Sequence, residues 1–236
     1  MPQEVTNPEA ILVVFSEPGE TVALHEFNEW YDEEHVPLRM SRFPEFLTGA
    51  RYEAMDGGGP GFSAIYQVNT LGLFDQPRYR SLRTDRSARE ADILARIGTL
   101  DRRTYRSIHL ERRPSSEHNT TYHPHILTVE LTRHSPELLT EIHSFEGWIM
   151  TQVGQIHDSS VIGHLQPPST DPVRTPRYIF IFEFMNQDYE QSCQLAKLAQ
   201  SPDQDQAVIR KWKLARGWQN SSTQLSTVHQ SLYPFK

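Results

Sequence analysis

The sequence contains a single cysteine, Cys193, among 236 residues. One thiol excludes an internal disulfide, so folding does not require an oxidising compartment. Cys193 lies in a Leu-rich segment with no adjacent base, and we expect it to be unreactive. No apolar stretch approaches the roughly 20 residues of a membrane-spanning helix. The short apolar run at 11–15 lacks the basic flank of a secretory signal, so we expect a cytoplasmic protein.

Positive charge is also scarce. Lys and Arg number 23 against 30 Asp and Glu, a formal charge of −7, and the basic residues form no long run. Nucleic-acid binding depends on clustered cations, so no nucleic-acid partner is expected. Because no apolar stretch is long enough to span a bilayer, no membrane partner is expected either. The composition is 37% hydrophobic and 22% charged, which is typical of a globular chain able to close a core.

Motifs for cofactors and metals are missing as well. The Gly-rich segment 57–61 is not followed by the Lys-Ser/Thr of a phosphate-binding loop, and no dinucleotide fingerprint occurs. His123 and His125 share a strand face, with His118 nearby, but no carboxylate follows at a metal-ligand spacing. We therefore expect no cofactor and no metal.

Hydrophobic periodicity predicts a repeated order of strand, helix, strand, strand, helix and strand. In the first half the strands are predicted at 10–16, 46–55, 62–68 and 104–110, and the helices at 20–36 and 77–100. Pro37 is expected to end the first helix. In the second half the strands are predicted at 125–131, 155–165, 178–184 and 221–232, with helices at 135–153 and 187–218 and a Pro-rich loop at 166–176.

A short sequence similarity also links the halves. Phe27-Asn-Glu-Trp30 aligns with Phe145-Glu-Gly-Trp148 in the first predicted helix of each half, which indicates an internal duplication. Each half would be a ferredoxin-like unit of an α+β protein. The predicted units are residues 1–113 and 122–236, joined by a polar linker at 114–121. Pairing their open sheet faces would form one intramolecular barrel with the helices outside.

The segment from Phe27 to Arg39 (FNEWYDEEHVPLR), followed by RFPEF at 42–46, resembles the EthD-like branch of the dimeric α/β-barrel superfamily. The resemblance covers about the first 110 residues and rests on the pattern Trp-Tyr-x-x-x-His-x-Pro. Single-repeat members form homodimers, so the chain resembles a fused, fungal-type member that forms its own pseudo-dimer, with further homodimerisation left open. The superfamily includes cofactor-free cyclases, dehydratases, isomerases and anthrone oxygenases, together with haem-degrading enzymes.

The aligned positions of the second half lack proton-transferring groups. Tyr31, Asp32, Glu34 and His35 of the first half correspond there to Ile149, Met150, Gln152 and Val153. The alignment therefore predicts one working site, in the first half.

The predicted catalytic residues are His35, Asp32 and Tyr31. An imidazole with an ordinary pKa near 6.5 can take and return a proton near neutrality. Asp32, one helical turn before His35, would hold the second ring nitrogen, and Tyr31 would present its hydroxyl at the same opening. The alternative is that His35 only caps the helix C-terminus, where the helix dipole favours a cation.

Aromatic and basic residues around this segment are the expected substrate-binding groups. They are Phe27, Trp30, Arg39, Phe46, Tyr52 and Tyr66. Tyr52 and Tyr66 would form a flat apolar slot, and Arg39 or Arg51 would hold an enolate or carboxylate. Core packing is the competing interpretation and is favoured for Phe27, Trp30 and Phe46. Either arginine is equally suited to a surface ion pair, and His109 is a further acid–base candidate if its strand face turns inward.

Three functions remain open on this basis. The first, whose substrate class the resemblance alone implies, is a cofactor-independent lyase or cyclase acting on a small aromatic, polyketide-like metabolite. The second is a cofactor-free oxygenase or a haem-binding protein of the same superfamily. The third is a non-catalytic protein that binds a small apolar molecule.

Overall fold

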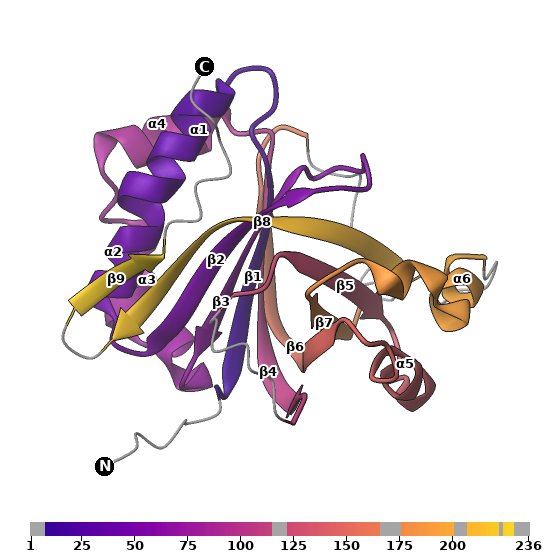
Figure 1. Ribbon diagram of the computed structural model, residues 1–236. Helices are drawn as coiled ribbons and strands as arrows, with labels where there is room; N and C mark the ends of the chain where they lie inside the picture. The colour runs from indigo at the N-terminus through magenta and orange to yellow at the C-terminus, as the bar shows by residue number, and fades with distance from the viewer. Residues whose placement is uncertain (1–7, 115–121, 166–175, 201–206, 222–223, 229–236) are drawn as a thin grey trace, which may run out of the picture.

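The computed structural model describes residues 8–114, 122–165, 176–200, 207–221 and 224–228. Its centre is a closed antiparallel β-barrel of α+β type (Figure 1). The strand order is β2-β3-β1-β4-β6-β7-β5-β8, pairing of β2 with β8 closes the barrel, and β9 extends β8. Figure 1 shows α1 to α4 outside one side of the barrel and α5 and α6 outside the other.

The elements have the following bounds. The strands are β1 (Ala10–Glu17), β2 (Phe46–Ala54), β3 (Phe62–Val68), β4 (Thr99–Arg112), β5 (His125–Leu131), β6 (Trp148–Ile162), β7 (Tyr178–Phe184), β8 (Val208–Ser221) and β9 (Gln224–Val228). The α-helices are α1 (Leu24–Trp30), α2 (Val36–Arg42), α3 (Pro77–Arg80), α4 (Ala88–Arg96), α5 (Pro136–Ile142) and α6 (Cys193–Gln200). Between them lie a π-helical turn, η1 (Tyr31–His35), and the 3₁₀ turns η2 (Leu71–Asp75), η3 (Ser81–Arg83) and η4 (Asp188–Gln191). No helix within these ranges is long and apolar enough to cross a bilayer.

Strand β1 shows how the sequence builds the core. Ile11, Val13 and Phe15 point into the barrel, whereas Leu12 and Val14 pack under the helices of the first half. Because successive side chains of a strand face opposite sides, the unbroken apolar run is buried on both faces, as its sequence predicts. A third cluster lies between the barrel and α5 and α6. The predicted strands at 10–16, 46–55, 62–68, 125–131 and 178–184 are confirmed.

The prediction that Pro37 ends the first helix is wrong. The helical segment runs on to Arg42, with Pro37 in the first turn of α2. The π-turn precedes it, and the N–H of Val36 donates to the carbonyl of Tyr31, five residues earlier. A proline is tolerated in a first helical turn, where its missing N–H has no partner to lose.

The first half differs from prediction in its second helical segment too. The predicted helix at 77–100 is divided into α3, η3 and α4, and β4 begins at Thr99 and not at residue 104. Ser87 caps α4 by accepting a hydrogen bond from the N–H of Glu90, at 2.9 Å. The helix therefore restarts at a capping residue after a polar loop.

Two predicted helices of the second half are partly strand. The segment at 135–153 contains only α5, after which β6 begins at Trp148, and β8 occupies 208–221 where helix was expected. Residues 148–153 are all buried, and Trp148 and Val153 belong to the core cluster under α5 and α6, so the apolar pattern of this segment does not alternate. In β8 the Lys, Arg, Ala and Leu residues favour a helix, but pairing with β2 and β5 overrides that preference.

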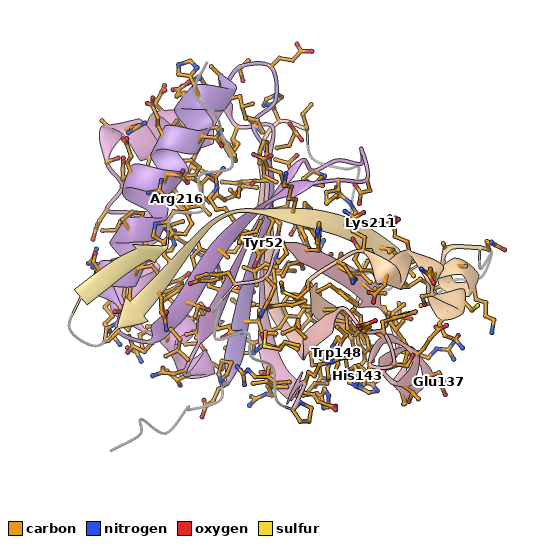
Figure 2. The ribbon with its side chains drawn as sticks, viewed as in Figure 1. Tyr52, Glu137, His143, Trp148, Lys211 and Arg216 are labelled. Atoms are coloured by element: carbon orange, nitrogen blue, oxygen red, sulfur yellow. The ribbon has the colours of Figure 1, made fainter. Side chains whose placement is uncertain are left out.

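This correction removes the proposed alignment of the two halves around Trp148. Phe145 lies in the turn after α5, and Trp148 starts a strand with its ring stacked on His143, 4.1 Å between centroids. Figure 2 shows both labelled side chains beside α5. Ile149, Met150, Gln152 and Val153 are strand residues of β6 and are not structural counterparts of Tyr31, Asp32, Glu34 and His35. The alignment therefore no longer supports a single working site.

Candidate active site

A buried polar pair of the first half joins His35 and Glu90. Nδ1 of His35 lies 3.0 Å from Oε1 of Glu90, and the two side chains are 6% and 5% exposed. His35 ends η1, and Glu90 is in the first turn of α4. The carboxylate can only accept, so Nδ1 carries the proton and Nε2 is left as the basic ring nitrogen.

The π-turn sets the position of the imidazole. A π-turn adds one residue to the helical register, which turns the residues after it to a new face. The His35 ring packs against Trp30 and Tyr31, with centroids 4.5 and 5.0 Å apart. These aromatic contacts bury the imidazole while one edge remains at a pocket wall.

Burial and nearby charge keep the imidazole neutral. Loss of solvation is the main cause that lowers the pKa of His35 to about 4, and the Arg39 guanidinium lowers it further, against the opposing effect of Glu90. Burial alone raises the pKa of Glu90, but its hydrogen bond with His35 and the nearby cations outweigh that and lower it. Near pH 7 the pair is therefore a neutral imidazole bonded to a carboxylate.

The pocket beside this pair has a volume of about 180 Å³. Its lining residues are His35, Arg39, Tyr79, Leu82, Arg83, Arg86, Glu90, Leu94, Leu100, Arg102, Ser160 and Ile162. Ser160 and Ile162 belong to β6, so the second half of the chain completes the wall. The pocket combines an apolar surface, four arginines and one histidine, and this arrangement can bind and deprotonate a small acid.

Comparison with solved structures identifies the fold. A chain described as an anthrone oxidase-like protein matches with a TM-score of 0.55 at 9% identity, covering 89% of this chain and 92% of that one. A candidate monooxygenase from Lactobacillus acidophilus NCFM gives a TM-score of 0.49 at 9% identity, covering 94% and 100%. Another from Fusobacterium nucleatum gives 0.49 at 10% identity, covering 96% and 100%.

The chain therefore shares the fold of the anthrone oxidase-like structure, a closed antiparallel β-barrel with helices outside it. No protein-family model matches the sequence. No curated protein matches it at a significant level.

The expected contact between Asp32 and His35 is not made. Asp32 instead bonds Arg51 at 2.6 Å and Arg216 of β8 at 3.0 Å, and Glu90 takes the position at the imidazole. These two ion pairs hold the Asp32 carboxylate against strands β2 and β8. In Figure 2 the labelled Arg216 lies between β8 and the helices of the first half.

Tyr31 contacts His35 but does not reach the pocket wall. Its ring is 1% exposed, and within the described residues its hydroxyl has no hydrogen-bond partner of ordinary geometry. Burial raises the pKa of the Tyr31 phenol, so it is a neutral group near pH 7. Of the residues named from the sequence, only His35 and Arg39 line this pocket.

The expected aromatic slot is divided between two cores. Tyr66, Phe27, Trp30 and Phe46 pack under the first-half helices, whereas Tyr52 points into the barrel. A β-bulge between Phe46 and Thr48 shifts the register of β2, so Phe46 and Tyr52 face opposite sides of the sheet. Tyr52 and Tyr66 therefore do not form one binding surface, and the core interpretation holds for Phe27, Trp30 and Phe46.

The other candidates lie elsewhere. Arg51 is a buried side chain stacked on Tyr31, with its guanidinium carbon 4.6 Å from the ring centroid. His109 lies 3.3 Å from Glu111 and does not line the pocket. His123 pairs with Glu183 at 2.6 Å, and His118 falls outside the described residues. The part of the chain that the structure describes contains no group of three or more His, Cys, Asp or Glu placed to hold a metal.

Sequence reasoning missed Glu90, Arg83, Arg86 and Arg102. Ser87-x-x-Glu90 has the form of a capping box, in which the glutamate normally bonds back to its own helix end. Here the Ser87 hydroxyl caps the helix while the Glu90 side chain turns to His35. The capping pattern marks the first turn of α4, but the partner 55 residues away depends on tertiary structure.

Proposed function

We propose that this protein is a cofactor-independent enzyme in which His35 removes a proton from a carbon next to the carbonyl of a small aromatic, polyketide-like substrate. The supporting observation is the buried His35–Glu90 pair at the wall of a pocket rich in arginine. The lowered pKa of His35 keeps its imidazole in the basic form, ready to accept a proton. The Glu90 carboxylate opposes this lowering, because it stabilises the imidazolium that forms when His35 accepts the proton.

In the proposed reaction, the proton that His35 removes from the substrate is later returned to it. Nε2 of His35 takes the proton, the electron pair of the C–H bond becomes an enolate, and Arg39 stabilises the enolate oxygen. Arg39 is well placed for this role because its guanidinium bonds the His35 carbonyl at 2.7 Å and lines the same pocket. The imidazolium then returns the proton to a departing hydroxyl, which leaves as water, or to the carbonyl oxygen attacked during ring closure.

A cofactor-free oxygenase is the second candidate, and it uses the same first step. The carbanion would add to O₂, the peroxide would take up the proton, and loss of water would leave a new carbonyl. The oxygenase is kept as a candidate because one structure with the same fold is described as an anthrone oxidase-like protein. Oxygen uptake separates it from the lyase, and a Soret band would indicate the haem-binding alternative.

We also infer the organisation of the chain. The order strand, helix, strand, strand, helix, strand occurs on both sides of residues 115–121. This supports two ferredoxin-like units, 1–113 and 122–236, that form a pseudo-dimer of the EthD-like type. A small aromatic molecule would be its partner in the cytoplasm, with no nucleic-acid or membrane partner.

The test measures proton exchange with a simple ketone. In D₂O, the wild-type protein should catalyse exchange of the protons next to the carbonyl of 2-tetralone for deuterium. NMR measures the rate of this exchange. His35→Ala should reduce the rate by about two to four orders of magnitude. His25→Gln, at an exposed position of α1, is the control and should leave it unchanged. No exchange by wild type, or equal exchange by His35→Ala, would overturn the proposal and favour a non-catalytic binding protein.

A further inference from the structure

The arginines of the pocket at His35 are more numerous than proton abstraction requires. Arg39, Arg83, Arg86 and Arg102 line a space whose only acidic group, Glu90, is bonded to His35. A concave surface lined by one sign of charge focuses its field and attracts a ligand of the opposite sign. This positive pocket lies in a chain whose formal charge is −7.

The four arginines are not equivalent. Arg39 is tied to the backbone at His35, and Arg102 pairs with Asp158 at 3.3 Å and lies over the Tyr79 ring, 5.8 Å from its centroid. Arg83 and Arg86 are exposed, and among the described residues neither has a carboxylate within ion-pair distance. They lie in η3 and the loop leading to α4, so both can turn to the pocket mouth.

We propose that the substrate carries a carboxylate, held by Arg83 and Arg86, on an aromatic ring that packs against Leu82, Leu94 and Ile162. The inference rests on the proposed function for the identity of the site and adds the chemical class of its ligand. An arginine pair matches the geometry of a carboxylate, and the apolar wall suits a flat ring. A volume of about 180 Å³ is below the ~300 Å³ of typical ligand pockets, so the acid is compact.

Binding of 2-naphthoate to the full chain tests this inference. The comparison compound is 2-naphthamide, an uncharged analogue of the same size. By calorimetry, 2-naphthoate should bind at least about tenfold more tightly than the amide. Arg83→Gln/Arg86→Gln should weaken the acid about tenfold and leave the amide unchanged. The control Arg106→Gln/Arg112→Gln removes two exposed arginines of β4 that do not line the pocket, and should change binding less than twofold.

The site is checked by the imidazole NMR signal of His35, which is assigned by its absence in His35→Gln and should shift on addition of 2-naphthoate. His35→Gln itself should still bind the acid. No binding at millimolar concentration, equal affinity for acid and amide, or equal weakening by both double variants overturns the inference. The proposed function fails separately, if 2-tetralone exchange does not depend on His35.

Discussion

His35 and Glu90 connect the π-turn after α1 to the first turn of α4 through a buried contact of 3.0 Å between Nδ1 and Oε1. Each group changes the protonation of the other. The carboxylate fixes the tautomer that leaves Nε2 basic, and the imidazole lowers the pKa of Glu90. The contact between Nδ1 and Oε1 therefore holds the imidazole in place and determines which of its nitrogens carries the proton.

Replacement of Glu90 tests the positioning role of this carboxylate. Glu90→Gln keeps the side-chain shape but removes the charge that stabilises a protonated His35, so the pKa of His35 should fall further. We expect 2-tetralone exchange to slow about 10- to 100-fold, with folding stability reduced by about 1–3 kcal/mol. NMR titration measures the pKa of His35. If Glu90 had only a structural role, this pKa would not change in the variant.

Asp92→Asn is the matched control for that experiment. It makes the same chemical change on the same helix, at an exposed carboxylate that pairs with Arg96. Exchange and the His35 titration should remain as in wild type. If Glu90→Gln behaves like this control, Glu90 has no part in setting the protonation of His35.

The lowered pKa of His35 also predicts a pH-dependent stability. Between pH 6.5 and about 4 the unfolded chain binds a proton at His35 that the folded chain does not. Stability should therefore fall as pH decreases through this range, by at most about 3 kcal/mol from this group. Urea unfolding at pH 7.5 and pH 5 measures the change.

His35→Gln isolates this contribution, because glutamine does not titrate. The variant should lose less stability than wild type between the two pH values. His25→Gln, on the exposed face of α1, should retain the wild-type dependence. Identical slopes for His35→Gln and wild type would mean that His35 titrates normally in the folded protein.

The sequence contains enough local information to predict most of the barrel but less of the site. Strands with an unbroken apolar run or clear alternation, such as β1 and β7, are predictable because the pattern matches their burial. Segments such as β6 and β8 are not, because pairing on both sides overrides their helical preference.

Within the site, too, some residues can be recognised from the local sequence and others only from the folded structure. His35 can be singled out by its residue type and by the motif around it. Glu90 and Arg102 meet it only after folding, and the π-turn and the bulge in β2 change which faces their neighbours occupy. A one-residue change of register reverses the face of every later side chain in a strand.

Replacement of Arg51 tests the contact that this residue of β2 makes with the first helical segment. Its guanidinium bonds Asp32 at 2.6 Å and Asn28 at 2.7 Å, and it is almost fully buried. Arg51→Met should reduce folding stability by about 1–3 kcal/mol, because the half-buried side chains of Asp32 and Asn28 lose a buried donor. Arg80→Met, at a 63% exposed side chain paired with Asp75, should cost less than about 1 kcal/mol. Equal urea midpoints for the two variants would contradict a structural role for Arg51.

Gly154 tests the assignment of β6 as a barrel strand. It pairs with Ser107 of β4, and an added Cβ would lie 2.6 Å from Cβ of Tyr105 and 3.1 Å from Cδ1 of Ile11. Because both neighbours are fully buried in the barrel, Gly154→Ala should reduce stability by about 1–3 kcal/mol. Gly72→Ala, whose nearest atom would be Thr70 Oγ1 at 3.7 Å, should cost less than about 0.5 kcal/mol. If urea unfolding shows that the two variants are equally stable, Tyr105 and β6 do not pack as closely as the barrel requires.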